Sequence, residues 1–259
     1  MKEEDFPERF TGVWRLYGKQ ALRNFMNSHI CVTGLGGVGS WAAEALARSG
    51  IGRITLVDPD VVVTTNINRQ IQALKGNLGK SKAQALAERI KEISPDCRVT
   101  VKAERVTPHN LTEIIVQEGF DYVIEAIDDI TAKAALIAFC SKNGIPLVTS
   151  GGAGGKTDPT RIAISDLSRT EQDPLLSRLR RQLRQKHDFP RGKESFDIAA
   201  VYSTEQQKYI NESNVPVSED AHAGTEMPRY GTTVVVTAAF GMTAASVVLR
   251  YLADAAAVT

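Results

Sequence analysis

Residues 29–50 read HICVTGLGGVGSWAAEALARSG, and this stretch decides the fold. HICVTG predicts a strand and GSWAAEALARSG predicts a helix, with a glycine loop between them. Gly34, Gly36 and Gly39 form the pattern G-x-G-x-x-G, and Gly37 is an additional glycine. These glycines allow a tight turn and a close approach of phosphate to the free N–H groups at the helix N-terminus. The stretch therefore predicts a strand–loop–helix unit that binds a nucleotide.

Short apolar runs alternate with helical patterns on both sides of this unit. RITLVD, CRVTVKAERV, DYVIEAID and IPLVTSG predict strands, while SKAQALAERIKEI and AALIAFCSKN predict helices. This alternation predicts an α/β fold with a mainly parallel sheet flanked by helices, Rossmann-like in type. We expect a single domain over residues 1–259, in which 1–165 form the nucleotide-binding part and 166–259 a C-terminal segment.

The C-terminal segment has a different character. RIAISD predicts one more strand, whereas residues 188–229 are polar without a clear period and predict loops, partly mobile, near a site. Residues 232–249 carry no charge over 18 positions, which is the lower limit for a membrane-spanning helix. They are rich in Thr, Ala, Ser and Gly, so we expect a buried helix or strand–helix without stable membrane insertion, and peripheral membrane association stays open.

Composition and cysteine usage narrow the classes of function. The formal net charge is +1, so any attraction of nucleic acid must be local. Cys31, Cys97 and Cys140 lie far apart and form neither a disulfide framework nor a CxxC zinc pair. The N-terminal MKEEDFPERF is acidic and lacks the apolar run of a secretory signal. A cytoplasmic protein is the expectation.

Polar residues after the glycine loop distinguish an ATP site from an NAD site. The glycine loop alone does not distinguish them. Asp58 ends a predicted strand nineteen residues after Gly39, where a carboxylate can accept hydrogen bonds from ribose hydroxyls. Asn66, Arg69 and Lys82 follow. Lys82 lies in the first turn of a predicted helix, where a cation opposes the helix dipole unless an anion is nearby. Arg69 and Lys82 together favour a triphosphate whose pyrophosphate leaves, although a solvated helix start is the alternative for Lys82 alone.

Two further features follow predicted strands. Asp128 stands at a strand end, where a carboxylate could bind Mg²⁺ between phosphates. A helix N-cap is the alternative role for Asp128, and Asp129 is its competitor. The glycine-rich run at residues 151–155 predicts a loop for close approach of a base, a monovalent cation site built from carbonyl oxygens, or a flexible turn.

The set GLGGVG, VDPD, NINRQ, LGKSK and AIDD resembles the E1-like adenylating superfamily. The resemblance implies that Asp58 binds ribose, that Asn66, Arg69 and Lys82 contact phosphates, and that Asp128 supports Mg²⁺. It also implies a homodimer in which an arginine near the N-terminus reaches the partner's ATP. Arg15 is the first candidate for that arginine and Arg9 the second.

A narrower resemblance covers nearly the whole chain. RFTGVWRLYG, TNINRQIQAL, IPLVTSGGAGGKTDPTRIAISDLSRTEQDPL and YSTE are similar to the tRNA threonylcarbamoyladenosine dehydratase family. That family uses ATP to activate the carboxylate of threonylcarbamoyladenosine at tRNA position 37, and ring closure expels AMP. Some members have cysteines before YSTE and near the last apolar segment, where this chain has Ala200 and PRYG.

Other functions remain as alternatives. The E1-like resemblance also fits an adenylyltransferase that activates a ubiquitin-like sulfur carrier, with a sulfur-acceptor or cysteine desulfurase system as a partner. The missing catalytic cysteine and CxxC pairs disfavour that function. An NAD-dependent dehydrogenase and a nucleotide-binding scaffold without catalysis are the remaining alternatives, and the polar set after the glycine loop disfavours both.

The stretch DPLLSRLRRQLRQKHDFPRGK predicts an amphipathic helix with a basic face. Its leucines recur at helical spacing, and its basic side chains could neutralise several phosphates of a polyanion. A solvated charged helix is the alternative, but within a tRNA-modifying family we expect a nucleic-acid site. The expected tRNA contacts are Arg178, Arg180, Arg181, Arg184 and Lys186.

Overall fold

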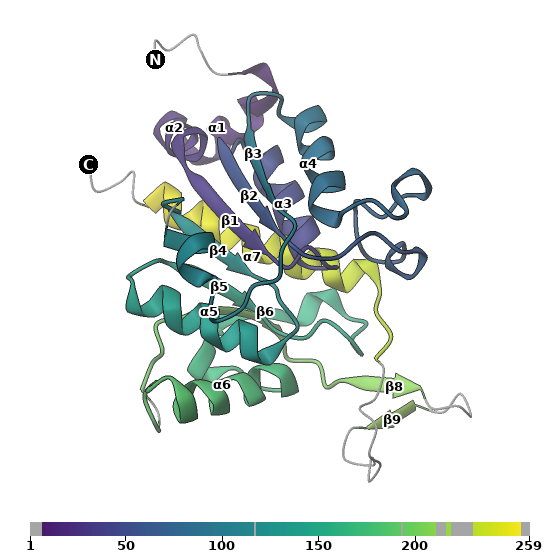
Figure 1. Ribbon diagram of the computed structural model, residues 1–259, viewed down its shortest axis with the longest axis vertical. Coiled ribbons are helices and arrows are strands. Elements are labelled where there is room, and N and C mark those ends of the chain that lie inside the picture. The colour runs from purple at the N-terminus through teal and green to yellow at the C-terminus, as the bar shows by residue number, and fades with distance from the viewer. Residues whose placement is uncertain (1–6, 117, 193, 211–215, 219–229, 255–259) are drawn as a thin grey trace.

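A central sheet organises the part of the chain that the computed structural model describes, which is residues 7–116, 118–192, 194–210, 216–218 and 230–254 (Figure 1). Its strands are β1 (His29–Thr33), β2 (Arg53–Val57), β3 (Arg98–Lys102), β4 (Tyr122–Glu125), β5 (Leu147–Ser150), β6 (Ile162–Asp166) and β7 (Ala199–Ser203). The order across the sheet is β3-β2-β1-β4-β5-β7-β6, and only β6 runs antiparallel to its neighbour. The predicted mainly parallel sheet is confirmed.

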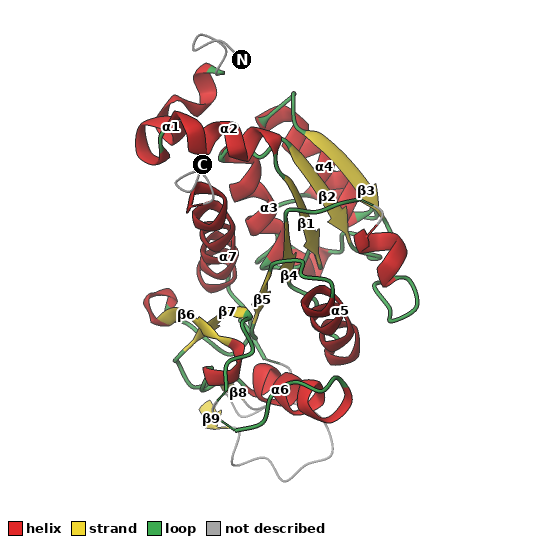
Figure 2. Ribbon diagram, turned by 90° about the vertical axis from the view of Figure 1, so that its left-hand side faces the viewer, coloured by secondary structure: helices red, strands yellow, loops and turns green. Residues whose placement is uncertain are grey.

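Helices cover both faces of the sheet (Figure 2). One face carries α2 (Lys19–Asn27), α3 (Gly39–Arg48), α4 (Lys82–Ile93) and α7 (Val234–Asp254), with α1 (Thr11–Tyr17) beside α2. The other face carries α5 (Ile130–Lys142) and α6 (Pro174–Lys186). Short elements complete the described chain: η1 (Glu8–Phe10), η2 (Thr64–Asn66), η3 (Lys75–Asn77), η4 (Thr112–Val116), η5 (Pro159–Arg161), η6 (Leu167–Arg169), and the antiparallel pair β8 (Lys208–Ile210) and β9 (Pro216–Ser218).

Strand β1 lies in the middle of the sheet and is buried along its whole length. Because side chains alternate along a strand, Ile30 and Val32 join the core with α3 and α7, while Cys31 joins the core with α5. The strand order reverses between β1 and β4. In open α/β sheets, the crevice at such a reversal, beyond the carboxyl ends of the strands, is where ligands bind.

The expectation of loops throughout residues 188–229 is wrong at the short antiparallel pair β8 and β9, and also at strand β7. This strand pairs in parallel with β5 and antiparallel with β6, so it lies inside the sheet. AAVYS is too short to show a period, and a strand buried on both faces has no polar alternation, so only its pairing partners define it. The expected mobile loops at 211–215 and 219–229 lie outside the described residues.

Helix α7 accounts for the uncharged C-terminal run. Val236, Phe240, Ala244 and Val248 recur at intervals of four on its buried face. A Cβ on Gly241 would overlap the carbonyl oxygen of Val38, so glycine allows α7 to pack closely against the start of α3. Within the described chain, α7 alone is long and apolar enough to cross a membrane, but 44% of that window is buried in the protein. Its contacts fit a core helix.

Candidate nucleotide-binding site

A cavity of about 1160 Å³ opens at the carboxyl ends of β1, β2, β4 and β5. It is lined by the first glycine loop, the residues after β2, the turn after β4 and the glycine-rich run after β5. Of the residues expected to bind nucleotide, those that line this cavity are Gly34, Gly36, Gly37, Asp58, Asn66, Arg69, Lys82 and Asp128. The sequence therefore identified side chains that the fold brings together from four separate segments.

Gly39 has a different position from the other loop glycines. It is the first residue of α3, and a Cβ there would overlap the carbonyl oxygen of Gly34. Gly34 itself has φ +80°, in the left-handed region that favours glycine. Gly39 therefore fixes the fold of the loop, while Gly36, which has open space around it, faces the cavity.

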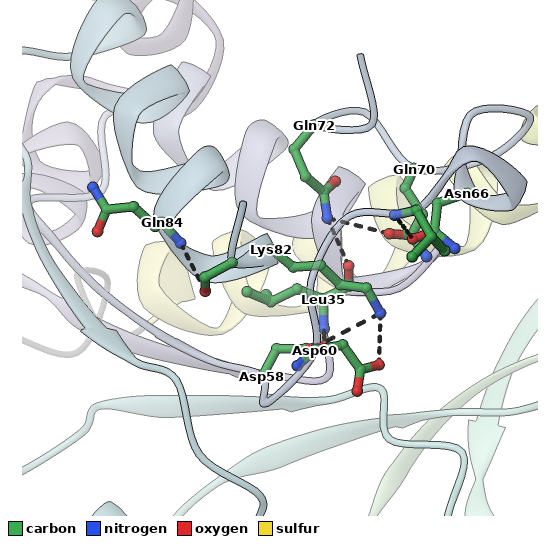
Figure 3. Close-up of polar contacts among 10 residues, drawn as sticks. Leu35, Asp58, Asp60, Asn66, Gln70, Gln72, Lys82 and Gln84 are labelled. Atoms are coloured by element: carbon green, nitrogen blue, oxygen red, sulfur yellow. Dashed lines mark hydrogen bonds and ion pairs between the residues drawn. The ribbon is translucent and has the colours of Figure 1, made fainter. Parts of the chain in front are cut away.

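Asp58 fastens the glycine loop to the end of β2 (Figure 3). Its Oδ2 accepts a hydrogen bond of 2.6 Å from the backbone N–H of Leu35, and its Oδ1 accepts one of 2.9 Å from Asp60 N–H. Burial raises the pKa of Asp58, and these two hydrogen bonds together with the charge of Lys82 oppose that rise. The carboxylate is thus oriented at the cavity wall before any ligand binds.

Lys82 begins α4 and is almost fully buried, with its ammonium group directed at two carboxylates (Figure 3). Its Nζ lies 2.7 Å from Asp60 Oδ2 and 3.9 Å from Asp58 Oδ1. The anion that a cation in a first helical turn requires is therefore supplied by the protein. The pairing of Lys82 with Asp60 was not predicted from the sequence, although Asp60 is the second acid of VDPD.

Asn66 is the last residue of η2, and Arg69 lies in the turn that follows it. The Nη1 of Arg69 donates to Thr65 O at 2.7 Å, and the backbone carbonyl of Arg69 accepts from the indole N–H of Trp41 at 2.9 Å. The buried Asn66 accepts from Val63 N–H at 3.1 Å. These contacts hold the loop against α3 and leave both side chains on the cavity wall.

The N-cap role belongs to Asp129 rather than Asp128. Asp129 Oδ1 accepts from Ala132 N–H at 2.7 Å at the start of α5. Asp128 is exposed on the cavity wall, and its carboxylate does not cap α5. The alternative that Asp128 caps this helix is therefore wrong.

A fully buried ion pair supports the turn that carries Asp128. Lys133 Nζ lies 2.5 Å from Glu125 Oε2 and donates to the carbonyl of Ile127 at 3.1 Å. Glu125 Oε1 accepts from Ile127 N–H at 2.8 Å. Both side chains are 0% exposed, and no spacing in the sequence indicated the pair.

The glycine-rich run after β5 forms the opposite wall and is tied to α6. Asp173 Oδ2 accepts from Gly152 N–H at 2.9 Å, and Asp173 Oδ1 caps α6 by accepting from Leu176 N–H at 3.0 Å. The buried Lys156 Nζ lies 3.8 Å from the same carboxylate. Burial lowers the pKa of Lys156, while Asp173 and Glu205 oppose this. One carboxylate thus fixes α6 relative to the cavity.

The N-terminal arginines lie outside the cavity of their own chain. Arg15 is exposed on α1, with its guanidinium 5.6 Å from the centre of the Trp14 ring. Arg9 donates through Nη1 to the carbonyl of Ile93 at 3.0 Å. Arg9 is therefore engaged at the end of α4 in its own chain.

The three cysteine thiols are all buried. Burial raises the pKa of Cys97 to about 11 and that of Cys140 to about 12, and it raises the pKa of Cys31 as well. A thiol must ionise to act as a nucleophile, so these groups are inert at neutral pH.

The fold and this cavity define an E1-like adenylating protein. The sequence profile of the ThiF family matches residues 9–258, and the chain belongs to that family. Within it, the chain is similar to a tRNA threonylcarbamoyladenosine dehydratase of Escherichia coli, with 49% identity across 96% of this chain and 95% of that protein. The protein of the same name from Haemophilus influenzae is 44% identical, again across 96% of this chain and 95% of its own length.

A solved structure extends the similarity to three dimensions. The crystal structure of the E. coli dehydratase in complex with ATP matches with a TM-score of 0.86 at 48% identity, covering 96% of this chain and 95% of that chain. The resemblance drawn from sequence motifs and the expected E1-type adenylation fold are confirmed.

Proposed function

We propose that this chain is an ATP-dependent, ligase-type enzyme that adenylates and cyclises the threonylcarbamoyl group of threonylcarbamoyladenosine at position 37 of tRNA. The observation that carries the proposal is whole-length similarity to a dehydratase of that name, combined with a cavity that keeps the expected polar set. The similar E. coli protein has been crystallised with ATP.

Different residues of the cavity bind different parts of ATP. Asp58 accepts from the ribose hydroxyls, while the loop N–H groups, Asn66, Arg69 and Lys82 contact the phosphates. Among the described residues no group of three or more His, Cys, Asp or Glu side chains could hold a metal ion. Asp128, which is exposed on the cavity wall, would bind Mg²⁺ together with phosphate oxygens, and Mg²⁺ would neutralise charge on the leaving pyrophosphate.

The reaction needs no thiol from this chain. A carboxylate oxygen of the substrate attacks the α-phosphorus of ATP, and the bond to pyrophosphate breaks. The carbamoyl group then attacks the activated carbonyl carbon and loses a proton, and AMP leaves with one carboxylate oxygen. The two reacting groups belong to one molecule, so closure gains from effective molarity. The chain positions ATP, stabilises departing charge and excludes water.

The inert cysteines favour this function over activation of a sulfur carrier followed by thiol transfer. A sulfur-acceptor or cysteine desulfurase partner could dock on the chain, but sulfur exchange would have to bypass these buried thiols.

A direct assay tests the proposal. The full-length protein is incubated with ATP, Mg²⁺ and tRNA that carries threonylcarbamoyladenosine. The tRNA is then digested, and the masses of its nucleosides are measured by mass spectrometry. We expect loss of the mass of one water at that nucleoside and stoichiometric AMP. Matched tRNA with unmodified adenosine 37 is the control. Pyrophosphate release that requires a carrier protein, or nicotinamide turnover, would contradict the proposal.

We also propose a homodimer in which Arg15 completes the partner's site. Large apolar side chains are exposed on α1, on the loop after β2 and on α7, where a second subunit could cover them: Leu16, Val61, Val63, Ile67, Leu74, Leu78, Val234, Val235, Met242 and Tyr251. Light scattering should give twice the chain mass. Mixing inactive Arg15→Ala and Lys82→Gln proteins should restore activity, because one site of each mixed dimer would be intact.

The remaining assignments form part of the same proposal. Helix α6 would face tRNA with Arg178, Arg180, Arg181, Arg184 and Lys186. The carbonyl oxygens of residues 151–155 are candidates for a monovalent cation. The sheet runs across residue 165, which favours one domain over 1–259. The chain would work in the cytoplasm, where tRNA is available.

A further inference from the structure

Helix α6 carries a second cavity, of about 450 Å³, on the side of its basic residues. Its lining consists of Ser177, Arg180, Arg181, Arg184, Gln185 and Arg191. None of these residues is acidic, and in the described part of the chain none of the four arginines lies within 4.0 Å of a carboxylate. Clustered guanidinium groups without a counter-charge repel one another, so an anion would stabilise them.

Two of these guanidinium groups are held in place by neighbouring groups. Arg180 Nη1 donates to the hydroxyl of Thr170, and Arg180 is only partly exposed. The guanidinium carbon of Arg184 lies 5.1 Å from the centre of the Phe196 ring. Burial and the charge of Arg184 lower the pKa of Arg180, with opposition from Asp173. Side chains fixed in this way lose little entropy when a ligand binds.

The loop after α6 brings in the fourth arginine. Arg184 Nε donates to Pro190 O at 3.1 Å, and its Nη2 donates to Gly192 O at 3.4 Å. These two bonds flank Arg191 and draw it back over the helix, so Arg191 joins a site to which helical spacing alone does not assign it. Gly192 has φ +78°, which permits the return of the chain.

We propose that this cavity binds a single phosphodiester group of an RNA backbone. Planar guanidinium groups match two phosphate oxygens at once, and Ser177 and Gln185 add neutral donors. The assignment deepens the proposed function, because it rests on tRNA as the substrate and selects one phosphate site within the basic face. Asp173 joins α6 to the glycine-rich wall of the nucleotide cavity, so the bound phosphate would lie at a fixed distance from ATP.

The test measures binding without turnover, so its failure is distinct from failure of the proposed reaction. Full-length protein binds an unmodified tRNA transcript without ATP across a salt series. We expect Arg191→Gln to weaken binding about tenfold and to lower the slope of log affinity against log salt by about 0.7–0.9, the value for one lost phosphate contact. Lys142→Gln removes one positive charge from the end of the neighbouring helix α5, outside the cavity, and should weaken binding less than threefold.

Arg98→Gln is the matched control, since it removes the same group from an exposed position on β3 at the opposite end of the sheet. Its affinity should equal that of the unaltered chain. Inorganic phosphate should also compete with the transcript less effectively in Arg191→Gln. Equal losses in Arg191→Gln and Lys142→Gln would show that RNA is attracted by the general positive charge of this surface and not by the cavity, and would overturn the proposal. Phosphate binding lost in Arg191→Gln with unchanged RNA affinity would assign the cavity to free phosphate and overturn the RNA assignment.

Discussion

Gly39→Ala and Gly36→Ala separate the structural from the binding role of the glycine loop. Both changes add one methyl group, three residues apart. At Gly39 the new Cβ would overlap Gly34 O and lie 3.1 Å from Gly34 C, so backbone must move. Overpacking a protein interior costs about 1–3 kcal/mol. Because the obstacle here is backbone and not a movable side chain, we expect the upper value of about 3 kcal/mol. Replacing glycine by alanine within a helix stabilises the folded state by at most about 1 kcal/mol, which offsets part of this cost.

The net loss at Gly39 is therefore about 2 kcal/mol of unfolding free energy. For a chain of this size, each kcal/mol lowers Tm by about 2–4 °C, so we expect a decrease of roughly 4–8 °C. At Gly36 a Cβ would meet nothing within 4 Å, so Tm should not fall. Because Gly36 lines the cavity, its methyl group should instead weaken ATP binding by about tenfold, equal to about 1.4 kcal/mol.

The assays are thermal unfolding at one protein concentration and calorimetric titration with ATP. Gly39→Ala should lose stability, and Gly36→Ala should lose affinity at unchanged Tm. A Gly39→Ala protein with the original Tm would refute the reasoning that this glycine is required by backbone contact. A Gly36→Ala protein with the original ATP affinity would refute the placement of phosphate at the loop.

Three further predictions follow from the polar contacts. Lys82→Gln should lower kcat for AMP formation about 100-fold, because it removes the cation of the cavity wall that we propose to contact the phosphates. Lys80→Gln, which removes a cation outside the cavity, should not lower it, and equal effects would contradict the assignment. Lys133→Met should lower the unfolding free energy by about 3–5 kcal/mol in urea titrations, since it leaves Glu125 charged and fully buried, and adding Glu125→Gln should recover most of the loss. Burial disfavours the ionised form of Asp166, but hydrogen bonds from Ser168, Phe196 and Ser195 outweigh it and lower the pKa of Asp166 to about 2. A lowered carboxyl pKa stabilises the folded state above pH 3.8, and this stabilisation disappears as pH falls towards 2. Asp166→Asn should therefore cost about 1 kcal/mol at pH 7 after solvent screening, and the difference should shrink in denaturant titrations below pH 4; a difference independent of pH would show that charge is not its source.

The local pattern of the sequence determined most of the nucleotide cavity. A glycine loop between strand and helix, an acid at the next strand end and cations shortly after it are features that chain order alone reveals. Parallel strands bring their carboxyl ends to one edge, so residues at those ends converge whatever the details of packing. Gly34, Asp58, Lys82 and Asp128 were identified in this way, and all of them line the cavity.

Only the tertiary structure decided which groups pair. Asp60 reaches Lys82 across 22 residues, Glu125 meets Lys133 inside the core, and Asp173 joins a glycine loop to α6. Strand β7 likewise depends on its neighbours, because five residues carry no period of their own. Hydrogen bonds and ion pairs form between groups that packing brings within about 3 Å, and sequence separation gives no measure of that distance.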